Sequence, residues 1–445
     1  MATQTGRCHV GSHLCGKVLF QQGFPSIGEA AGPMTRHGRR SWSRYIIRPC
    51  CCVLHALMVA MSSLTEGSAD PAFAAVRDVF EASFADGQNW GAAVSVVVNG
   101  RPVVDLWGGV ADTRTGRRWQ RDTACVTFSC TKAVTATAAL MVAERHSIEL
   151  QAPVVSWWPE YGAAGKSETT GEHLLSHAAG LPVVERRVSI QQAADPELMA
   201  GLLGGQHPLW EPGSKHGYHA FTFGWLAGEI VRRNAEMTVG DFVRSHISGD
   251  LMIGGSSAAL DGIARTGFPD ASEQQWASDT TAIPAKTVER LVEAYRDPQS
   301  LFTRATANPP ARYNHPDVLA AGWPASGLIT TARALADFYA RLSAGELLHP
   351  ENLTDAIRVR HSGSDAVMVL DSRYGLGYCD RLSCSRFPTT PDLERSDIPV
   401  PVARSGSVTS TISWRSRSYP TYVAMLSPGI VVQSISSKRP TRHCE

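Results

Sequence analysis

Val126-Thr-Phe-Ser-Cys-Thr-Lys-Ala133 is the stretch on which the interpretation of the fold depends. A helical pattern starts here and continues to about Arg145, which puts Ser129 and Lys132 three residues apart on one helix face. A serine hydroxyl becomes a strong nucleophile when a neighbouring base removes its proton, and a desolvated lysine can act as that base. The pattern therefore predicts a nucleophilic serine with a lysine partner. The structural alternative is an N-cap serine followed by a solvated lysine.

A second candidate for chemistry lies in a Pro-Gly loop, Glu211-Pro-Gly-Ser-Lys-His-Gly-Tyr-His-Ala220. The loop runs into a helical pattern from Phe221 to Arg233, and Tyr218 stands just before that helix. In this place the Tyr218 hydroxyl can share a proton with Lys132. The structural alternative is a half-buried tyrosine whose hydroxyl is satisfied elsewhere.

The remaining periodicity predicts an α+β fold. A helix is expected from Asp70 to about Gly87, followed by two β-rich runs, Ala92–Val98 and Pro102–Trp107, joined by the hairpin signal Asn99-Gly100. Further helices are expected at residues 132–145, 172–182, 221–233, 286–295 and 331–342. We expect the 172–182 helix, closed by Gly180 and including His177, to be structural. A helical region inserted after an N-terminal hairpin needs later strands to complete the sheet.

Together these segments resemble the serine β-lactamase and penicillin-binding-protein superfamily, in particular its esterase-like branch related to class C β-lactamases. The resemblance covers about Asp70 to Tyr378, and its most specific pieces are residues 126–133, 173–182 (HLLSHAAGLP) and 210–220, with similar segments at 323–342 and 374–377. It implies an antiparallel sheet flanked by helices, a mainly helical region, and a site between them. It also implies that Ser129 is acylated, that Lys132 is its proton partner and that Tyr218 is the base or proton shuttle. The family needs no metal or organic cofactor.

Two departures from the family pattern concern the substrate and the oxyanion hole. Class C β-lactamases carry Y-x-N, whereas the third position here is Ala220, so an amide that would contact a β-lactam side chain is missing. Ester substrates are therefore expected in preference to antibiotics. The third family element, K-T-G or H-x-G on a late strand, is absent, and Arg404-Ser-Gly406 is its nearest imitation. The alternatives are a β-lactamase or D-alanyl-D-alanine peptidase, and a non-catalytic relic or binding protein that keeps the pocket.

The two ends of the chain differ from its middle. Residues 1–60 are basic and aperiodic, and we expect them to be unstructured or not part of the true protein, while residues 61–378 form the serine hydrolase domain. Residues 379–445 are rich in Ser and Arg and are expected to contribute no closing strands. Re-reading Arg395 to Ser416 from the third base of Arg395 can give F-G-H-P-G, an H-x-G segment. Our hypothesis is a reading-frame change between about Cys379 and Glu394, which would leave the written chain poorly folded and nearly inactive.

The amino-acid composition limits the kinds of partner and the cellular compartment that we expect for this protein. The chain has 42 Lys and Arg against 41 Asp and Glu, which argues against a nucleic-acid partner. Its longest apolar run, Cys50 to Met61, is too short to span a bilayer. The ten cysteines include no C-x-x-C pair, and no zinc-binding pattern is present, so we expect a cytoplasmic protein without a metal. A small-molecule ester is the expected partner, and the sequence predicts neither its acyl and alcohol groups nor the oligomeric state.

Overall fold

The computed structural model describes residues 65–84, 89–256, 260–267, 285–382, 410–415 and 420–426. All of them belong to the larger of two units, Leu54–Glu445. The segment 1–60 and the tripeptide Arg404-Ser-Gly406, on which two of the sequence-based expectations fall, lie outside the described residues.

The N-terminal part of the domain is the expected helix and hairpin. Strands β2 (Gly91–Val98) and β3 (Arg101–Asp112) pair antiparallel. Asn99 and Gly100 between them have φ of +52° and +74°, the left-handed conformation that a tight hairpin turn requires. The helix is confirmed as a 3-10 turn (Pro71–Phe73) followed by α2 (Ala74–Ala82). Strand β1 (Thr65–Ala69) pairs with the free edge of β3, and the short β4 (Arg117–Arg118) also pairs with β3.

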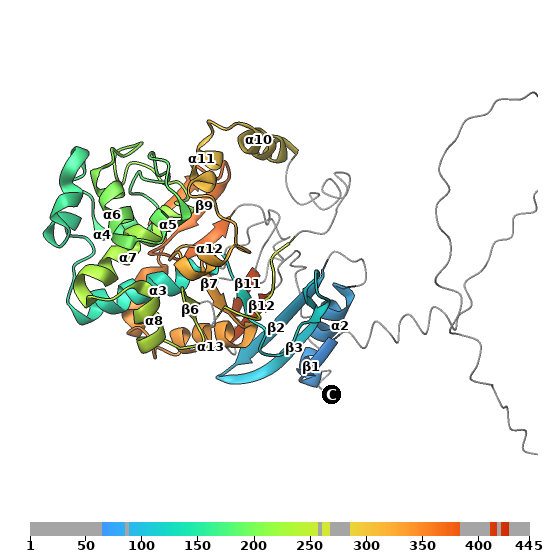
Figure 1. Ribbon diagram of the computed structural model, residues 1–445. Helices are drawn as coiled ribbons and strands as arrows, with labels where there is room; N and C mark the ends of the chain where they lie inside the picture. The colour runs from blue at the N-terminus through green and yellow to red at the C-terminus, as the bar shows by residue number, and fades with distance from the viewer. Residues whose placement is uncertain are drawn as a thin grey trace, which may run out of the picture. The chain divides into compact units, whose positions relative to one another are not determined.

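The C-terminal tail supplies two strands of the same sheet. Strand β12 (Pro420–Leu426) pairs antiparallel with β2, and β11 (Ser410–Arg415) pairs with β12, so the order is β1-β3-β2-β12-β11 (Figure 1). The expectation that the tail lacks closing strands is therefore wrong for these residues. Thr, Ile, Trp, Tyr and Val concentrate in these two short runs, and their β-propensity is hidden when the tail is judged by its overall Ser and Arg content.

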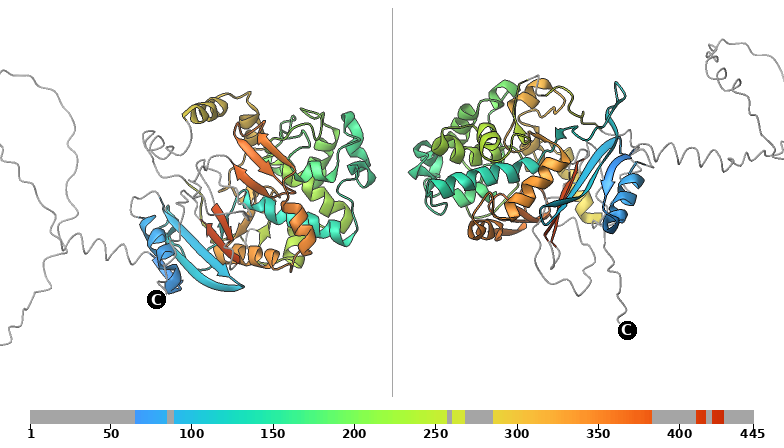
Figure 2. Two further views of the ribbon diagram at one scale, coloured as in Figure 1. Left: turned by 180° about the vertical axis from the view of Figure 1, so that it is seen from behind. Right: turned by 90° about the horizontal axis from the view of Figure 1, so that it is seen from below.

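The sheet is covered on both faces. On one face α2 buries Val76 and Phe80 against Val94 of β2 and Leu106 of β3. On the other face α13 (Ala332–Ser343) contacts β2 and β12, and its Leu335 and Phe338 belong to the main hydrophobic core (Figures 1 and 2). Because β2 has covers on both sides, nearly all of its residues are buried.

The helical region packs around α3 (Cys130–Arg145), α7 (Thr222–Ala235) and α8 (Val239–His246), which share the main core with α13. The other helices are α4 (Gly171–Leu175), α5 (Ile190–Ala193), α6 (Pro196–Gly205), α10 (Ala285–Arg296), α11 (Leu301–Ala307), α12 (Pro316–Ala321), α14 (Pro350–Ile357) and the 3-10 helices Val154–Ser156 and Pro159–Gly165. Two small antiparallel sheets complete the region: β5-β7-β6 (Cys125–Val126, Leu328–Thr330, Met252–Ile253) and β10-β9-β8 (Cys379–Leu382, Asp371–Tyr374, His361–Ser364). None of the described helices is long and apolar enough to cross a membrane.

Four of the helices expected here from periodicity are confirmed with ends that shift by one or two residues, and one is wrong. The 172–182 segment is helical only in α4, which ends at Leu175. His177 adopts φ of +61° and Gly180 φ of +73°, so the chain turns out of the helix before the glycine that was expected to end it. This turn brings His177 into contact with the segment that carries Tyr218.

Candidate active site

The short sheet β5-β7-β6 fixes the start of α3. The backbone N–H and the hydroxyl of Thr127 both donate to the Leu328 carbonyl, at 2.8 and 3.2 Å. In return the Leu328 N–H donates to the Thr131 hydroxyl at 2.9 Å. These bonds hold the strand-to-helix turn from both sides, and Ser129 stands on the turn.

Ser129 does not cap the helix that it precedes. Its own backbone is helical, and its side chain makes no capping hydrogen bond. Phe128 before it has φ of +45°, an uncommon conformation for a bulky residue, and its ring is held edge-on against Tyr313. In the described part of the chain, the Ser129 backbone N–H has no intramolecular acceptor. This N–H is free to donate to an oxygen of a bound substrate.

Tyr218 lies against Ser129. The two hydroxyl oxygens, Tyr218 Oη and Ser129 Oγ, are 2.6 Å apart, which is a short hydrogen bond. Burial raises the pKa of the Tyr218 phenol well above its ordinary value, and the hydrogen bond from Ser129 offsets only part of this. Tyr218 is thus a neutral phenol at pH 7.

Lys132 is buried on the same side of α3, one turn after Ser129, and is only 5% exposed. Its Nζ donates to the carbonyls of Ala220 and Ala325, at 2.8 and 3.0 Å, and lies 4.7 Å from the centre of the Tyr218 ring. No carboxylate among the described residues forms an ion pair with it. Burial therefore lowers the pKa of Lys132 to about 7.

The two carbonyls define what this amine can do. A neutral lysine amine has two N–H donors and one lone pair. When both donors are bound to the carbonyls of Ala220 and Ala325, the lone pair remains available to accept a proton. The geometry thus excludes the alternative of an N-cap serine with a solvated lysine.

A set of neutral histidines holds the segment around Tyr218. The Gly217 N–H donates to the His177 carbonyl at 3.1 Å, and the His219 N–H donates to His177 Nδ1 at 3.0 Å. His219 Nε2 accepts from the Leu181 N–H at 3.1 Å. Burial lowers the pKa of His177 well below its ordinary value and that of His219 to about 4, so both rings accept these bonds as neutral imidazoles. Among the described residues, no three His, Cys, Asp or Glu side chains are arranged to hold a metal ion.

Sequence reasoning brought together Ser129, Lys132 and Tyr218, but it missed a buried carboxylate that binds the backbone of Tyr218. The Tyr218 N–H donates to Oδ1 of the buried Asp365 at 3.0 Å. Asp365 lies 147 positions away in the sequence, between β8 and β9, and no local pattern marks it. The nearby Tyr374-Gly-Leu-Gly377 segment was the available signal, because it contains another tyrosine that binds the same carboxylate.

Apolar side chains gather beside Tyr218. Five buried residues form this cluster, and three half-buried ones pack on it: Val183, Trp210, Ala220, Ala305 and Val367, with Tyr218, Leu301 and Ala366. Ala220 thus has two roles, because its carbonyl binds Lys132 and its methyl group is part of the apolar surface.

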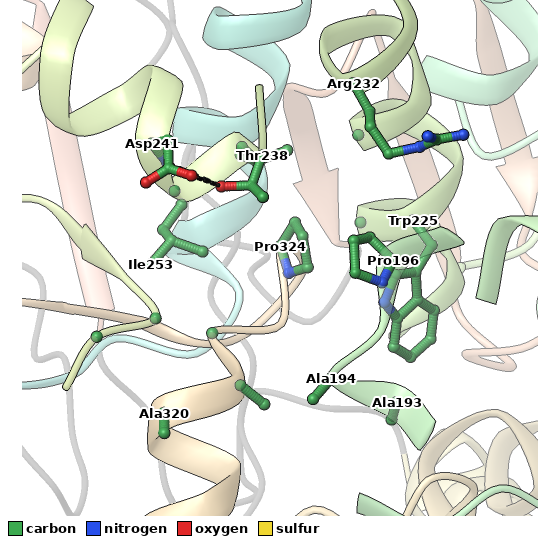
Figure 3. A pocket seen from close by; sticks show the side chains of 18 of the residues that line it. Ala193, Ala194, Pro196, Trp225, Arg232, Thr238, Asp241, Ile253, Ala320 and Pro324 are labelled. Atoms are coloured by element: carbon green, nitrogen blue, oxygen red, sulfur yellow. Dashed lines mark hydrogen bonds between the residues drawn. The ribbon is translucent and has the colours of Figure 1, made fainter. Parts of the chain in front are cut away.

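A separate cavity of about 290 Å³ lies between α7, α8 and the end of α12. Figure 3 shows Pro196, Trp225, Ile253 and Pro324 around it. None of the three candidate catalytic residues lines this cavity, so we do not assign the chemistry to it.

The matching family model is Beta-lactamase, which aligns with residues 76–427. The chain belongs to the Beta-lactamase family. This result confirms the resemblance seen in the sequence and the β-lactamase-like α+β fold. The family match extends through β12, the strand of the C-terminal tail that pairs with β2.

Three of the proteins that the chain is similar to are an esterase and two solved structures. It is 39% identical over 166 residues to the "Esterase/beta-lactamase LipL" of Mycobacterium tuberculosis, a match that covers 37% of this chain and 38% of LipL. A family VIII carboxylesterase structure is 26% identical, with a TM-score of 0.66, over 83% of this chain and 95% of that one. A penicillin-binding protein homologue from Caulobacter crescentus is 28% identical, with a TM-score of 0.65, over 81% and 93%.

Proposed function

We propose that this protein is a serine hydrolase that cleaves carboxylic esters through an acyl-enzyme on Ser129. The observation that carries the proposal is the 2.6 Å hydrogen bond between the hydroxyls of Ser129 and Tyr218. Beside it lies Lys132, which is buried and is partly uncharged at pH 7. The names of the similar proteins, an esterase/beta-lactamase and a family VIII carboxylesterase, support the same reaction class.

The direction of each pKa shift supports a division of roles in proton transfer. Its raised pKa keeps Tyr218 protonated at pH 7, so Tyr218 can accept the Ser129 proton only while it gives its own proton to another base, whereas Lys132 is partly neutral and can be that base. Ser129 Oγ attacks the ester carbonyl and gives its proton to Tyr218 Oη, while the Tyr218 proton passes to Lys132 Nζ. Tyr218 is unchanged after the transfer and acts as a shuttle. The Ser129 N–H stabilises the oxyanion, the alcohol leaves with the proton, and water then releases the acyl group by the reverse route.

The apolar cluster supports an ester with an apolar acyl or alcohol group. Ala220 has a methyl group where class C β-lactamases have an amide, so this position offers van der Waals contact and no side-chain hydrogen bond. Such a surface favours small aryl or alkyl esters over a β-lactam side chain that needs an amide partner.

The test is covalent labelling with a fluorophosphonate probe, followed by turnover of a short-chain aryl ester. Wild-type protein should label on Ser129 and hydrolyse the ester, and Ser129→Ala should lose both. Ser95→Ala is the matched control, because it removes another buried serine hydroxyl, on β2, from outside the site. Labelling and turnover that persist in Ser129→Ala would refute the nucleophile assignment.

A second candidate is β-lactam hydrolysis, which the name of LipL favours. The same preparation should therefore be tested with a chromogenic cephalosporin. Faster turnover of the cephalosporin than of the aryl ester would select this candidate. A well-folded protein that neither labels nor turns over either substrate would select the binding-protein alternative.

A further inference from the structure

Asp365 is a buried carboxylate without a cation. It is 2% exposed, and no lysine, arginine or histidine of the described residues forms an ion pair with it. Five hydrogen bonds surround it instead. Oδ1 accepts from the backbone N–H groups of Tyr218 (3.0 Å), Val367 (2.8 Å) and Met368 (2.8 Å), and Oδ2 accepts from the hydroxyls of Ser372 (3.0 Å) and Tyr374 (2.9 Å).

Such a group is expensive to bury, and a fold can usually close a loop without one. A carboxylate taken out of water must have its hydration replaced by hydrogen bonds from the protein. Four of the five donors come from the loop and strand that carry Asp365 itself, between Ser364 and Tyr374. The fifth donor is the N–H of Tyr218, and it is the one that connects this loop to the candidate catalytic residues.

The carboxylate controls Tyr218 in two ways. It fixes the backbone of Tyr218 directly, between the N–H groups of Gly217 and His219, which are both bound to His177. It also fixes Tyr374, whose ring is nearly parallel to the Tyr218 ring, with an interplanar angle of 18° and centroids 6.5 Å apart. Both the attachment of the Tyr218 side chain and the neighbour beside its ring therefore depend on Asp365.

We propose that Asp365 is a positioning residue for Tyr218, which holds the phenol oxygen at hydrogen-bonding distance from Ser129. This proposal rests on the proposed esterase function. The carboxylate touches neither Ser129 nor Lys132, so it acts only through Tyr218. A displacement of about 1 Å at a catalytic group can cost roughly 10²-fold in rate. Asparagine in place of Asp365 keeps one oxygen for the backbone N–H groups and turns its N–H₂ group toward the hydroxyls of Ser372 and Tyr374, which must then accept a hydrogen bond instead of donating one. We expect this change to displace Tyr374 and the Tyr218 ring beside it.

The experiment compares Asp365→Asn in two backgrounds, in the full chain with active sites counted by fluorophosphonate labelling. In the wild-type background, kcat for an aryl ester should fall about 10- to 100-fold while KM changes less than about twofold. In a Tyr218→Phe background, the same substitution should cause no further loss of kcat. A carboxylate that only stabilises the fold would instead lower activity by the same factor in both backgrounds.

Two further variants keep the result interpretable. Glu229→Gln alters another buried carboxylate, paired with Arg232 and Arg233 on α7, and should leave kcat per labelled site unchanged. Tyr374→Phe removes one donor and keeps the ring, so it should lower kcat by a smaller factor, again only when Tyr218 is present. If Asp365→Asn does not fold, Tyr374→Phe takes its place in the comparison of the two backgrounds.

The outcomes separate this proposal from the proposed function. If Ser129→Ala is inactive and Tyr218→Phe is slow, but Asp365→Asn keeps its kcat within about twofold, only the positioning role is wrong. Equal losses in both backgrounds also overturn it. If Ser129→Ala or Tyr218→Phe turns over like the wild type, the esterase mechanism is wrong and the role of Asp365 falls with it.

Discussion

Replacing Lys132 by methionine tests whether its amine is neutral in the folded protein. Burial lowers the pKa of Lys132 from 10.5 to about 7 in the folded state, whereas the unfolded chain keeps the ordinary value. Between these two pH values the unfolded chain holds a proton that the folded chain has released. The free energy of unfolding therefore rises with pH in this window, by about 1.4 kcal/mol per pH unit from this one group. Lys132→Met has no such group and should lack this slope.

The assay is urea denaturation followed by tryptophan fluorescence, from about pH 7.5 to about pH 9.5. Over this range the free energy of unfolding of the wild type should increase by about 3 kcal/mol relative to that of Lys132→Met. The comparison uses the change with pH and not the absolute stability, because the variant also leaves two carbonyls without a donor at every pH. This loss of stability is the same at every pH and therefore does not affect the change of the unfolding free energy with pH.

Lys166 is the matched control. It is also fully buried, its Nζ donates to the carbonyls of Ala163, Gly204 and Gln206, and burial lowers its pKa to about 8. Lys166→Met should lose a pH-dependent gain of the same sign, above about pH 8, but should keep ester hydrolysis. Lys132→Met should lose it.

The activity profile gives an independent reading of the same group. The proposed mechanism needs neutral Lys132, so kcat/KM should fall about tenfold between about pH 8 and about pH 6. A stability difference between wild type and Lys132→Met that does not change from about pH 7.5 to about pH 9.5 would refute the reasoning, since Lys132 would then be charged in the folded state.

Three other results are expected. Tyr218→Phe and Lys132→Ala should each lower kcat by ~10²–10⁴-fold, and the double variant should lose little more, because both side chains take part in the transfer of the same proton. Losses that multiply in the double variant would contradict this shared transfer. Ala220→Asn should lower aryl-ester turnover relative to cephalosporin turnover by placing an amide in the apolar cluster, and an unchanged ratio would remove Ala220 as a specificity determinant. If the written chain lacks one oxyanion donor, a version whose tail is re-read from Arg395 in the shifted frame, and therefore contains H-x-G, should have a kcat on the order of 10²–10³-fold higher than the written chain. Equal kcat values in the two versions would contradict the frame-change hypothesis.

Local pattern was enough to predict the elements that close on themselves. The Asn99-Gly100 turn and the amphipathic helices each depend on residues within a few positions of one another, and they form as predicted except at residues 172–182. The motif around Ser129 and Lys132 is local in the same way. Tyr218 was joined to them by resemblance, and the structure places its hydroxyl 2.6 Å from Ser129.

The contacts that orient Tyr218 could not be predicted in this way. His177 and His219 are 42 positions apart, and Asp365 is 147 positions from Tyr218. Each of these contacts needs a break from regular structure, namely the left-handed backbone at His177 and the loop between β8 and β9. Periodicity indicates which face of a helix or strand is buried, but it does not predict the position of a carboxylate on an irregular loop.

The C-terminal tail shows why its overall composition did not predict the two strands that it adds to the sheet beside β2. Strand β12 is aligned with β2 from Ala93 to Val98, so a segment of the tail that was expected to contribute no closing strand pairs with the edge of β2. A partner edge with hydrogen-bonding groups in register can fix a strand that its own pattern does not predict. The third family motif is a different matter, because Ser410–Arg415 and Pro420–Leu426 contain neither histidine nor glycine. These two strands complete the sheet without supplying H-x-G. In the proposed mechanism the Ser129 N–H, which has no backbone acceptor among the described residues, is one oxyanion donor, and a tail that supplies H-x-G would add a second, which is why a change in the tail is expected to act on rate.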